Sequence, residues 1–213
     1  MRKLVSVIVL CFGFLYIAHA QIDDAKPKKI LNQAKDYMTS FEDVSVEFEY
    51  NIKNEVHDID EQNRGKAMMK GSQYRIEIED QIMMSDGETA WTYLPESEEV
   101  QVLSLDDNDQ SNPLNVLTSW QENYRSKYIR METIAGRDIH IIDLIPHEGR
   151  SFFKIRVRIN DANNQLVSST IYDKNSTTYT YIIHEFNTNE GISDSKFRFD
   201  ESSHPGVEVI DLR

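Results

Sequence analysis

Long stretches of this 213-residue chain alternate strictly between apolar and polar side chains. The alternation runs through Val44–Ile52, Tyr74–Ile78 and Phe153–Ile159. A period of two places the apolar side chains on one face of a strand and the polar side chains on the other. Such strands are typical of an antiparallel sheet that buries one face and exposes the other to water. We therefore predict a mostly β fold.

Short turn-forming segments separate these runs. The strongest is Asp86–Gly87, because both residue types tolerate a positive φ in a two-residue hairpin. The others are Lys70–Ser72, Pro95–Ser97, Ala135–Arg137 and Asp161–Gln165. Their spacing predicts a meander of about ten strands, and a sheet of that size curls or closes.

One amphipathic helix precedes the strands. Asp23 and Asp24 can cap its start, and Pro27 suits its first turn. An apolar stripe at three- and four-residue spacing then runs through Ile30, Leu31, Ala34, Tyr37, Met38 and Phe41. We expect the helix to end near Thr39–Ser40.

Two later regions interrupt the strand pattern. After the acidic segment 106–112, Pro113–Leu117 with Trp120 predicts one or two short helices. Residues 188–195 are polar and predict a loop. Phe197–Asp200 then predicts a final short strand, followed by a polar tail.

The first twenty residues have the features of a signal peptide. Arg2 and Lys3 form a positive start, Leu4–Ile17 is almost entirely apolar, and Ala18–Ala20 supplies the small-x-small cleavage pattern. We therefore expect residues 1–20 to be removed and residues 21–213 to form a single domain. The one cysteine, Cys11, leaves with the signal, so a hydrophobic core and not disulfides must stabilise the mature chain.

The mature chain is strongly acidic. Loss of residues 1–20 removes two of the 23 basic residues and none of the 36 acidic ones, which changes the formal net charge from −13 to −15. A surface with this charge repels the phosphates of nucleic acid and of anionic lipid. We therefore exclude nucleic-acid binding.

A search for chemistry finds no catalytic or metal-binding motif. Nucleophile elbows, phosphate loops and zinc helices are absent, and the histidines of the mature chain lack ligand spacing. The acidic run Asp106–Asp109 lacks the glycine and terminal glutamate of an EF-hand loop. We expect no enzymatic activity, no cofactor and no metal.

The supply of helices is small for the apolar face of so many strands. Two or three short helices cover only part of a sheet of about ten strands. Either the sheet closes on a fully packed core, or a cavity remains beneath a helical lid. The residue pattern alone leaves both possibilities open.

Several segments resemble the outer-membrane lipoprotein carrier family, LolA. The resemblance is carried by Gly65–Ile78, by Met84–Pro95 with its Ser-Asp-Gly turn followed by Trp91 and Tyr93, and by Glu99–Val102. It continues in order through Asn112–Leu117, Asn164–Tyr172, Thr178–Tyr181, Lys196–Asp200 and Pro205–Val209. Together with the first helix, these motifs span nearly the whole mature chain.

The resemblance implies an incomplete antiparallel β-barrel whose concave apolar face is covered by the N-terminal helix and short lid helices. It also implies a periplasmic carrier that shuttles lipoproteins by their acyl chains. Its partners would be an inner-membrane lipoprotein-releasing transporter and an outer-membrane acceptor, and we expect a monomer. The family tends to carry a lid-binding arginine where this chain has Lys70–Ser72, and a lysine cannot form the same planar fork.

We predict a ligand-binding cavity on the apolar side of the central strands. Its expected lining is Val46, Phe48, Tyr50, Tyr74, Ile76, Ile78, Trp91, Tyr93, Leu114 and Leu117, and the expected lid residues are Ile30, Leu31, Ala34, Tyr37 and Met38. A shift of one residue would exchange the two faces of any strand, so the face assigned to each strand stays open.

Three other functions stay open from the sequence. A lipid-sensing or regulatory half-barrel would share the fold but signal instead of shuttling. A structural β-protein with a packed core would bind no ligand. A small hydrolase would need two convergent carboxylates in a cleft, which a sequence with 36 acidic residues cannot reveal.

Overall fold

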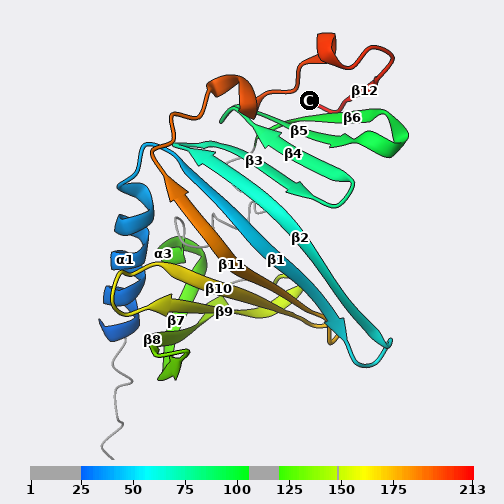
Figure 1. The fold of residues 1–213 in the computed structure, drawn as a ribbon. Coiled ribbons are helices and arrows are strands. Elements are labelled where there is room, and N and C mark those ends of the chain that lie inside the picture. The colour runs from blue at the N-terminus through cyan, green and yellow to red at the C-terminus, as the bar shows by residue number, and fades with distance from the viewer. Residues whose placement is uncertain (1–24, 106–119, 148) are drawn as a thin grey trace, which may run out of the picture.

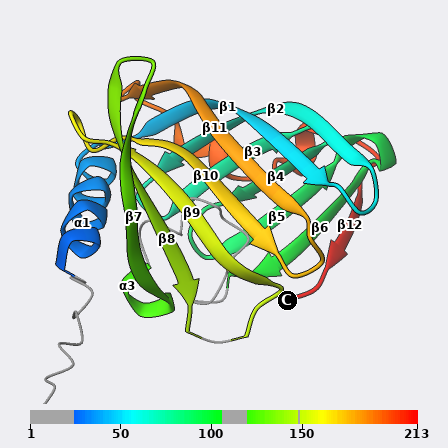
Figure 2. The ribbon, with the colours of Figure 1, turned by 90° about the horizontal axis from the view of Figure 1, so that it is seen from below.

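The computed structural model describes residues 25–105, 120–147 and 149–213. These residues form one 12-stranded sheet in the order β12-β6-β5-β4-β3-β2-β1-β11-β10-β9-β8-β7. The sheet curls without closing, and β12 and β7 are its two edges (Figures 1 and 2). The predicted fold class, an incomplete antiparallel barrel, is confirmed, but the predicted number of about ten strands was too low.

The strands are β1 (Val44–Asn54), β2 (Ile59–Lys70), β3 (Gln73–Ile78), β4 (Gln81–Ser85), β5 (Thr89–Leu94), β6 (Glu99–Ser104), β7 (Tyr124–Ile134), β8 (Arg137–Pro146), β9 (Phe152–Asn160), β10 (Leu166–Asp173), β11 (Thr178–Thr188) and β12 (Glu208–Asp211). The helices are α1 (Ala25–Thr39) and α3 (Trp120–Asn123), with short 3₁₀ turns η1 (Pro95–Ser97), η2 (Asp194–Phe197) and η3 (Glu201–Ser203).

Helix α1 forms where the sequence predicts it. Its buried residues are Pro27, Ile30, Leu31, Ala34 and Met38, which lie on one stripe. The helix ends at Thr39, whose Oγ1 donates to the carbonyl of Lys35 at 3.0 Å, while Ser40 Oγ donates to that of Tyr37 at 2.7 Å. These bonds satisfy carbonyls that the last turn leaves without backbone partners.

The sheet has an inner face, which carries Val46, Phe48 and Ile76, and an opposite outer face. A bulge in β11 keeps its apolar residues on the inner face: Ile183 lies opposite Phe48, whereas Phe186 lies opposite Val46. Because the spacing from 183 to 186 is odd, a regular strand would send one of them outward. His184 occupies the bulge and is exposed.

A second irregularity, between β9 and β10, shows that the predicted face of Phe153 is wrong. The sequence pattern assigns Phe153 to the apolar face of its strand, but Phe153 is 49% exposed. The register shifts at the end of β9, so that Phe152 lies opposite Asp173. Phe152 therefore packs against the core and stacks on Tyr124, with ring centroids 6.4 Å apart.

The C-terminal segment also differs from prediction. The strand predicted over Phe197–Asp200 does not form: Phe197 ends the 3₁₀ turn η2 and is fully buried. The last strand is β12, which lies in the polar tail, where no strand was predicted, and pairs in parallel with β6. Residues 194–204 lie against β3 and β5 (Figure 1), where Phe199 packs 5.0 Å from Tyr93.

Candidate ligand-binding site

The inner face of β1, β2, β3 and β11 carries a continuous apolar surface. Its buried members are Val44, Val46, Phe48, Ala67, Tyr74 and Ile76, and its partly buried members include Tyr50, Met69, Ile78, Met83, Tyr181 and Ile183. The strand register brings these residues together, because Ala67 lies opposite both Val46 and Ile76. The surface is therefore built by cross-strand pairing of the alternating apolar positions.

A small apolar cavity of about 40 Å³ lies in this surface. Its lining comes from five strands and consists of Val46, Phe48, Ala67, Ile76, Leu166, Ser169, Tyr181 and Ile183. The lining contains no charged side chain. A dry site of this kind selects hydrocarbon by burial and provides little for directional recognition.

Gly65 fixes the position of one cavity wall. A Cβ atom at this position would lie 2.5 Å from Phe48 Cζ and 2.7 Å from the Glu77 carbonyl oxygen. The absence of a side chain thus lets the Phe48 ring lie across β2 and border the cavity.

Tyrosine rings form one end of the surface. Tyr50 stacks on Tyr181 with ring centroids 4.9 Å apart, and Tyr179 follows at 6.5 Å from Tyr50. Burial raises the pKa of the Tyr181 phenol well above its usual range, and the neighbouring Tyr50 raises it further. Burial also raises the pKa of Tyr50. Both rings are therefore neutral at physiological pH and suit an apolar ligand.

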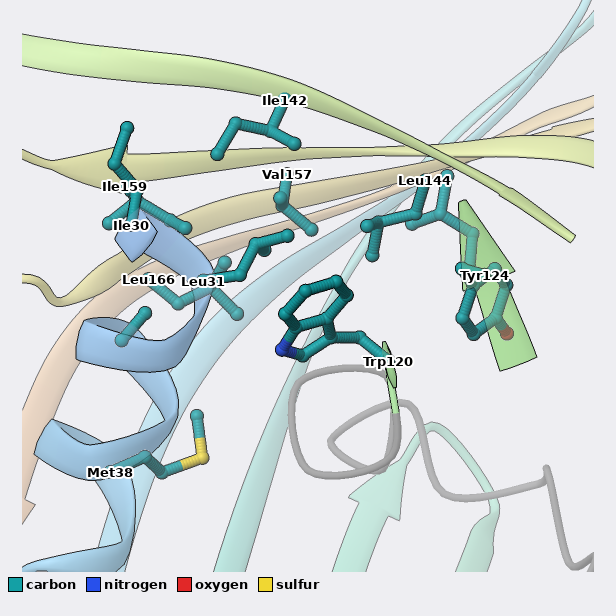
Figure 3. Close-up of a cluster of buried hydrophobic side chains, with 12 residues drawn as sticks. Ile30, Leu31, Met38, Trp120, Tyr124, Ile142, Leu144, Val157, Ile159 and Leu166 are labelled. Atoms are coloured by element: carbon teal, nitrogen blue, oxygen red, sulfur yellow. The ribbon is translucent and has the colours of Figure 1, made fainter. Parts of the chain in front are cut away.

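The β7–β10 part of the inner face is covered. Helix α1 contributes Ile30, Leu31, Ala34 and Met38 to a buried cluster with Trp120, Tyr124, Ile142, Leu144, Ile155, Val157, Ile159 and Leu166. Figure 3 shows the Trp120 ring between α1 and the sheet. Met69 and Ile183 pack against both this cluster and the open apolar surface, so the two regions are continuous.

The predicted cavity residues fall into four groups. Val46, Phe48 and Ile76 line the cavity, and Tyr50, Tyr74 and Ile78 belong to the same apolar surface without lining the cavity. Leu114 and Leu117 lie outside the described residues. The remaining two, Trp91 and Tyr93, need a correction.

Trp91 and Tyr93 lie on the outer face. Ile76 lies opposite Met83, and Met83 lies opposite Thr92, so Thr92 has the inner position. Trp91 lies opposite Met84, and Tyr93 packs against Phe199 and His204 at 5.0 and 4.8 Å. The prediction placed both residues on the inner face, and a shift of one residue puts both on the outer face.

Several cavity residues were not predicted from the sequence. Tyr181 and Ile183 belong to an alternation in β11 that was visible in the sequence, whereas Ala67, Leu166 and Ser169 carry no such signal. Of the predicted lid residues, Ile30, Leu31, Ala34 and Met38 pack on the β7–β10 part of the sheet. Tyr37 instead stacks on Phe186, with centroids 5.9 Å apart.

Lys70 contacts the loop before η2. Its Nζ donates to the Ile192 carbonyl at 3.1 Å and to Asp194 Oδ1 at 2.8 Å. Among the described residues, the hydrogen bonds of Lys70 reach this loop and not α1.

Asp43 holds the same loop from the other side. Its carboxylate accepts the backbone N–H groups of Glu190, Gly191 and Ile192 at 2.8, 2.9 and 3.0 Å. Burial alone would raise the pKa of Asp43, but these N–H groups and the charge of Lys70 lower it below its usual range. The connection between α1 and β1 is therefore fixed to the loop at 190–192.

Comparison with known proteins decides the family. The family model described as "Outer membrane lipoprotein carrier protein LolA" matches residues 39–200. The chain belongs to the LolA family. LolA proteins are carriers and not enzymes, which agrees with the sequence analysis. Within the described ranges, no group of three His, Cys, Asp or Glu side chains is placed to hold a metal ion.

Two LolA relatives are similar along the sequence. The outer-membrane lipoprotein carrier protein of Psychromonas ingrahamii is 28% identical over 133 residues, which cover 60% of this chain and 62% of that protein, less than two thirds of its length. The protein of the same description from Actinobacillus pleuropneumoniae is 22% identical over 218 residues and aligns over 100% of this chain and 97% of its own.

Solved structures share the LolA-type fold. A putative outer membrane lipoprotein-sorting protein domain from Vibrio parahaemolyticus has a TM-score of 0.51 at 13% identity, covering 83% of this chain and 97% of that one. An uncharacterized conserved protein from Thermus thermophilus has a TM-score of 0.57 at 9% identity, covering 87% and 99%. At these identities the likeness shows the fold alone. Among the helices described here, none is long and apolar enough to cross a bilayer.

Proposed function

We propose that this chain carries lipoproteins across the periplasm by binding their acyl chains on the inner face of the sheet. Residues 1–20 would direct export, and residues 21–213 would form the single carrier domain. An inner-membrane lipoprotein-releasing transporter would load the cargo, and an outer-membrane acceptor would receive it. The observation that carries the proposal is the uncharged cavity among half-buried apolar residues on a sheet of the LolA family.

The energetics of such a site suit a carrier. Each methylene group moved from water into an apolar site is worth about 0.8 kcal/mol, so a long acyl chain gains about 10 kcal/mol. This gain is large enough for retention during transit. It depends on chain length and not on the identity of the attached protein, which suits a carrier of many lipoproteins.

The cavity must enlarge before it can hold an acyl chain. A cavity of about 150 Å³ accommodates only one benzene molecule, and the present volume is about 40 Å³. Helix α1 is the element whose displacement would enlarge it, because Leu31 and Met38 pack in a cluster that shares Met69 and Ile183 with the open surface. We propose that α1 acts as the lid and that its packing competes with the ligand.

Ala67→Leu tests the binding site. Ala67 is 4% exposed and lines the cavity, so the larger side chain should fill the space that an acyl chain needs. We expect the affinity for a fluorescent fatty-acid probe to fall at least about tenfold. The control is Trp91→Phe on the outer face, which should keep the affinity within about twofold.

Native mass spectrometry of protein purified from the periplasm without detergent provides the complementary test. Bound lipid or lipopeptide is the expected result. A ligand-free mass together with no probe binding by the wild-type protein would contradict the proposal and indicate a packed core. Equal probe binding by wild type and Ala67→Leu would place the ligand elsewhere.

A further inference from the structure

Among the residues that the structure describes, three buried side-chain atoms near α3 and the start of β7 have no hydrogen-bond partner. They are Trp120 Nε1, Ser126 Oγ and Arg150 Nη1. Trp120 and Ser126 are only 2% and 3% exposed. Nearly all buried polar groups in proteins are paired, and an unpaired one points to a missing water, ion or ligand. Two of these atoms can only donate hydrogen bonds and the third can donate one, which favours a partner rich in acceptor oxygens.

Trp120 and Ser126 line the same cavity, which has a volume of about 340 Å³. It lies between α1, α3 and β7. Arg150 does not line the cavity, but its guanidinium lies 5.4 Å from the ring of Tyr124, which does. Gln121 Nε2 donates to Asn32 Oδ1 at 2.9 Å and thereby joins α3 to α1 at the cavity wall. The unpaired atoms therefore gather around one defined space.

The charged groups of this cavity are all basic. Lys28 of α1 and Arg125 of β7 line it together with the ionisable His147, and the described lining includes no carboxylate. Helix α1, which forms one wall, carries four lysines and a single acid, Asp36. Helix α3 carries one acid, Glu122, outside the lining. In a chain with a formal net charge of −13, such a basic site concentrates anions locally.

We propose that this cavity binds a phosphate group, namely the headgroup of an anionic lipid whose acyl chain occupies the inner face. The proposal rests on the function proposed above. Lysine, arginine, an indole N–H and a hydroxyl together supply donors from several directions, as a tetrahedral oxyanion requires. Trp120 connects the two parts of the site, because it belongs to the apolar cluster under α1 (Figure 3) and also lines the basic cavity.

The indole N–H signal of Trp120 provides a direct measurement. The chain has two tryptophans, so Trp91→Phe leaves a single indole signal in a ¹H–¹⁵N spectrum. Three probes are titrated: inorganic phosphate, palmitoyl lysophosphatidic acid and monopalmitoylglycerol. The two lipids share the acyl chain and the glycerol and differ in the phosphate. We expect lysophosphatidic acid to bind at least about tenfold more tightly than monopalmitoylglycerol and to shift the indole proton downfield.

A matched pair of double variants locates the site. Lys28→Gln with Arg125→Gln removes the two cations of the cavity, and Lys29→Gln with Lys127→Gln removes two exposed cations from the same elements outside its lining. The first pair should abolish the preference for the phosphate-bearing lipid, and the second should keep it. Equal effects of the two pairs would overturn the proposal.

The probes separate the possible outcomes. A response to inorganic phosphate without binding of either lipid would support the phosphate site and contradict the acyl-carrier function. Equal binding of both lipids with no phosphate response would support the carrier and overturn the phosphate site. Binding of lysophosphatidic acid with a much weaker phosphate response would support a lipid headgroup as the source of the phosphate.

Discussion

The two halves of the sheet follow one sequence pattern and reach different degrees of burial. In the half under α1, five inner-face aliphatic side chains are at most 1% exposed, namely Ile142, Leu144, Ile155, Val157 and Ile159. In the other half, Val46, Phe48 and Ile76 are also buried, at 6%, 6% and 0% exposure. Other members of that half remain partly exposed among the described residues, namely Tyr50, Ile78, Met83, Tyr181 and Ile183. The alternation of residues determines which face of the sheet is apolar. Coverage by a helix such as α1 then determines whether that face is a buried core or a surface that can bind a ligand.

This difference separates stability from function within a single sheet. The covered half buries more apolar area and should supply most of the hydrophobic free energy of folding. The open half retains apolar surface that a ligand can cover. Substitutions in the covered half should therefore mainly lower the free energy of unfolding, whereas substitutions in the open half should mainly lower the affinity for a ligand.

The largest expected effect is in the covered half. Leu144→Ala removes a fully buried side chain, so it should lower the free energy of unfolding by about 2–5 kcal/mol. Ile78→Ala, at a partly buried position of the open half, should cost no more than about half as much. Urea denaturation of both variants measures this ratio, and equal losses would contradict the division into two halves.

Gly65→Ala probes a tightly packed point of the open half. The new Cβ atom would overlap Phe48 and the Glu77 carbonyl, so we expect a loss of about 1–3 kcal/mol in unfolding free energy. Gly149→Ala is the control, since nothing lies within 4 Å of a Cβ atom there. If Gly65→Ala unfolded at the wild-type denaturant concentration, Phe48 would have to be free to move away from β2.

A smaller, pH-dependent effect is expected at Asp43. Because the folded state lowers its pKa, the carboxylate stabilises the fold above the unfolded pKa of about 3.9. This contribution is lost as the pH falls through the folded-state pKa. Asp43→Asn should therefore lower the urea midpoint at pH 7, and the difference from wild type should shrink as the pH falls below the unfolded pKa and through the lowered folded-state pKa.

The exposed residue Asp36 provides the control for this experiment. Asp36→Asn on α1 removes the same charge without touching the loop at 190–192, and its urea midpoint should match wild type at pH 7. A difference between Asp43→Asn and wild type that persisted at low pH would show that shape and not charge holds the loop.

The sequence predicted those elements whose apolar pattern is local. α1 and the strands containing Val46 and Ile76 follow from spacing alone, because each buries a single face. The missed β12 has only four residues and pairs in parallel with a strand about a hundred positions earlier. No local period can indicate such a pairing.

The site was predicted less completely because both faces of part of the sheet are covered. Trp91 and Tyr93 have apolar neighbours on the outer face, and one of them is Phe199, which is distant in sequence. Their aromatic character therefore does not reveal their face. Leu166 and Ser169 reach the cavity through an irregular pairing of β9 and β10, and such shifts in register follow from tertiary packing.

The anchoring of the α1–β1 connection determines how the helix can move. Asp43 binds three backbone N–H groups, and the Glu42 N–H donates to Asn189 Oδ1 at 2.8 Å. With this end fixed, α1 is a lever about 22 Å long, at 1.5 Å per residue. A rotation of about 20° about this pivot would move the far end by about 8 Å but the region of Met38 very little. Lys26 Nζ makes a cation–π contact with Tyr128 at that far end, 3.8 Å from the ring centroid. A weak contact so far from the pivot opposes rotation of the helix more effectively than the same contact near Met38.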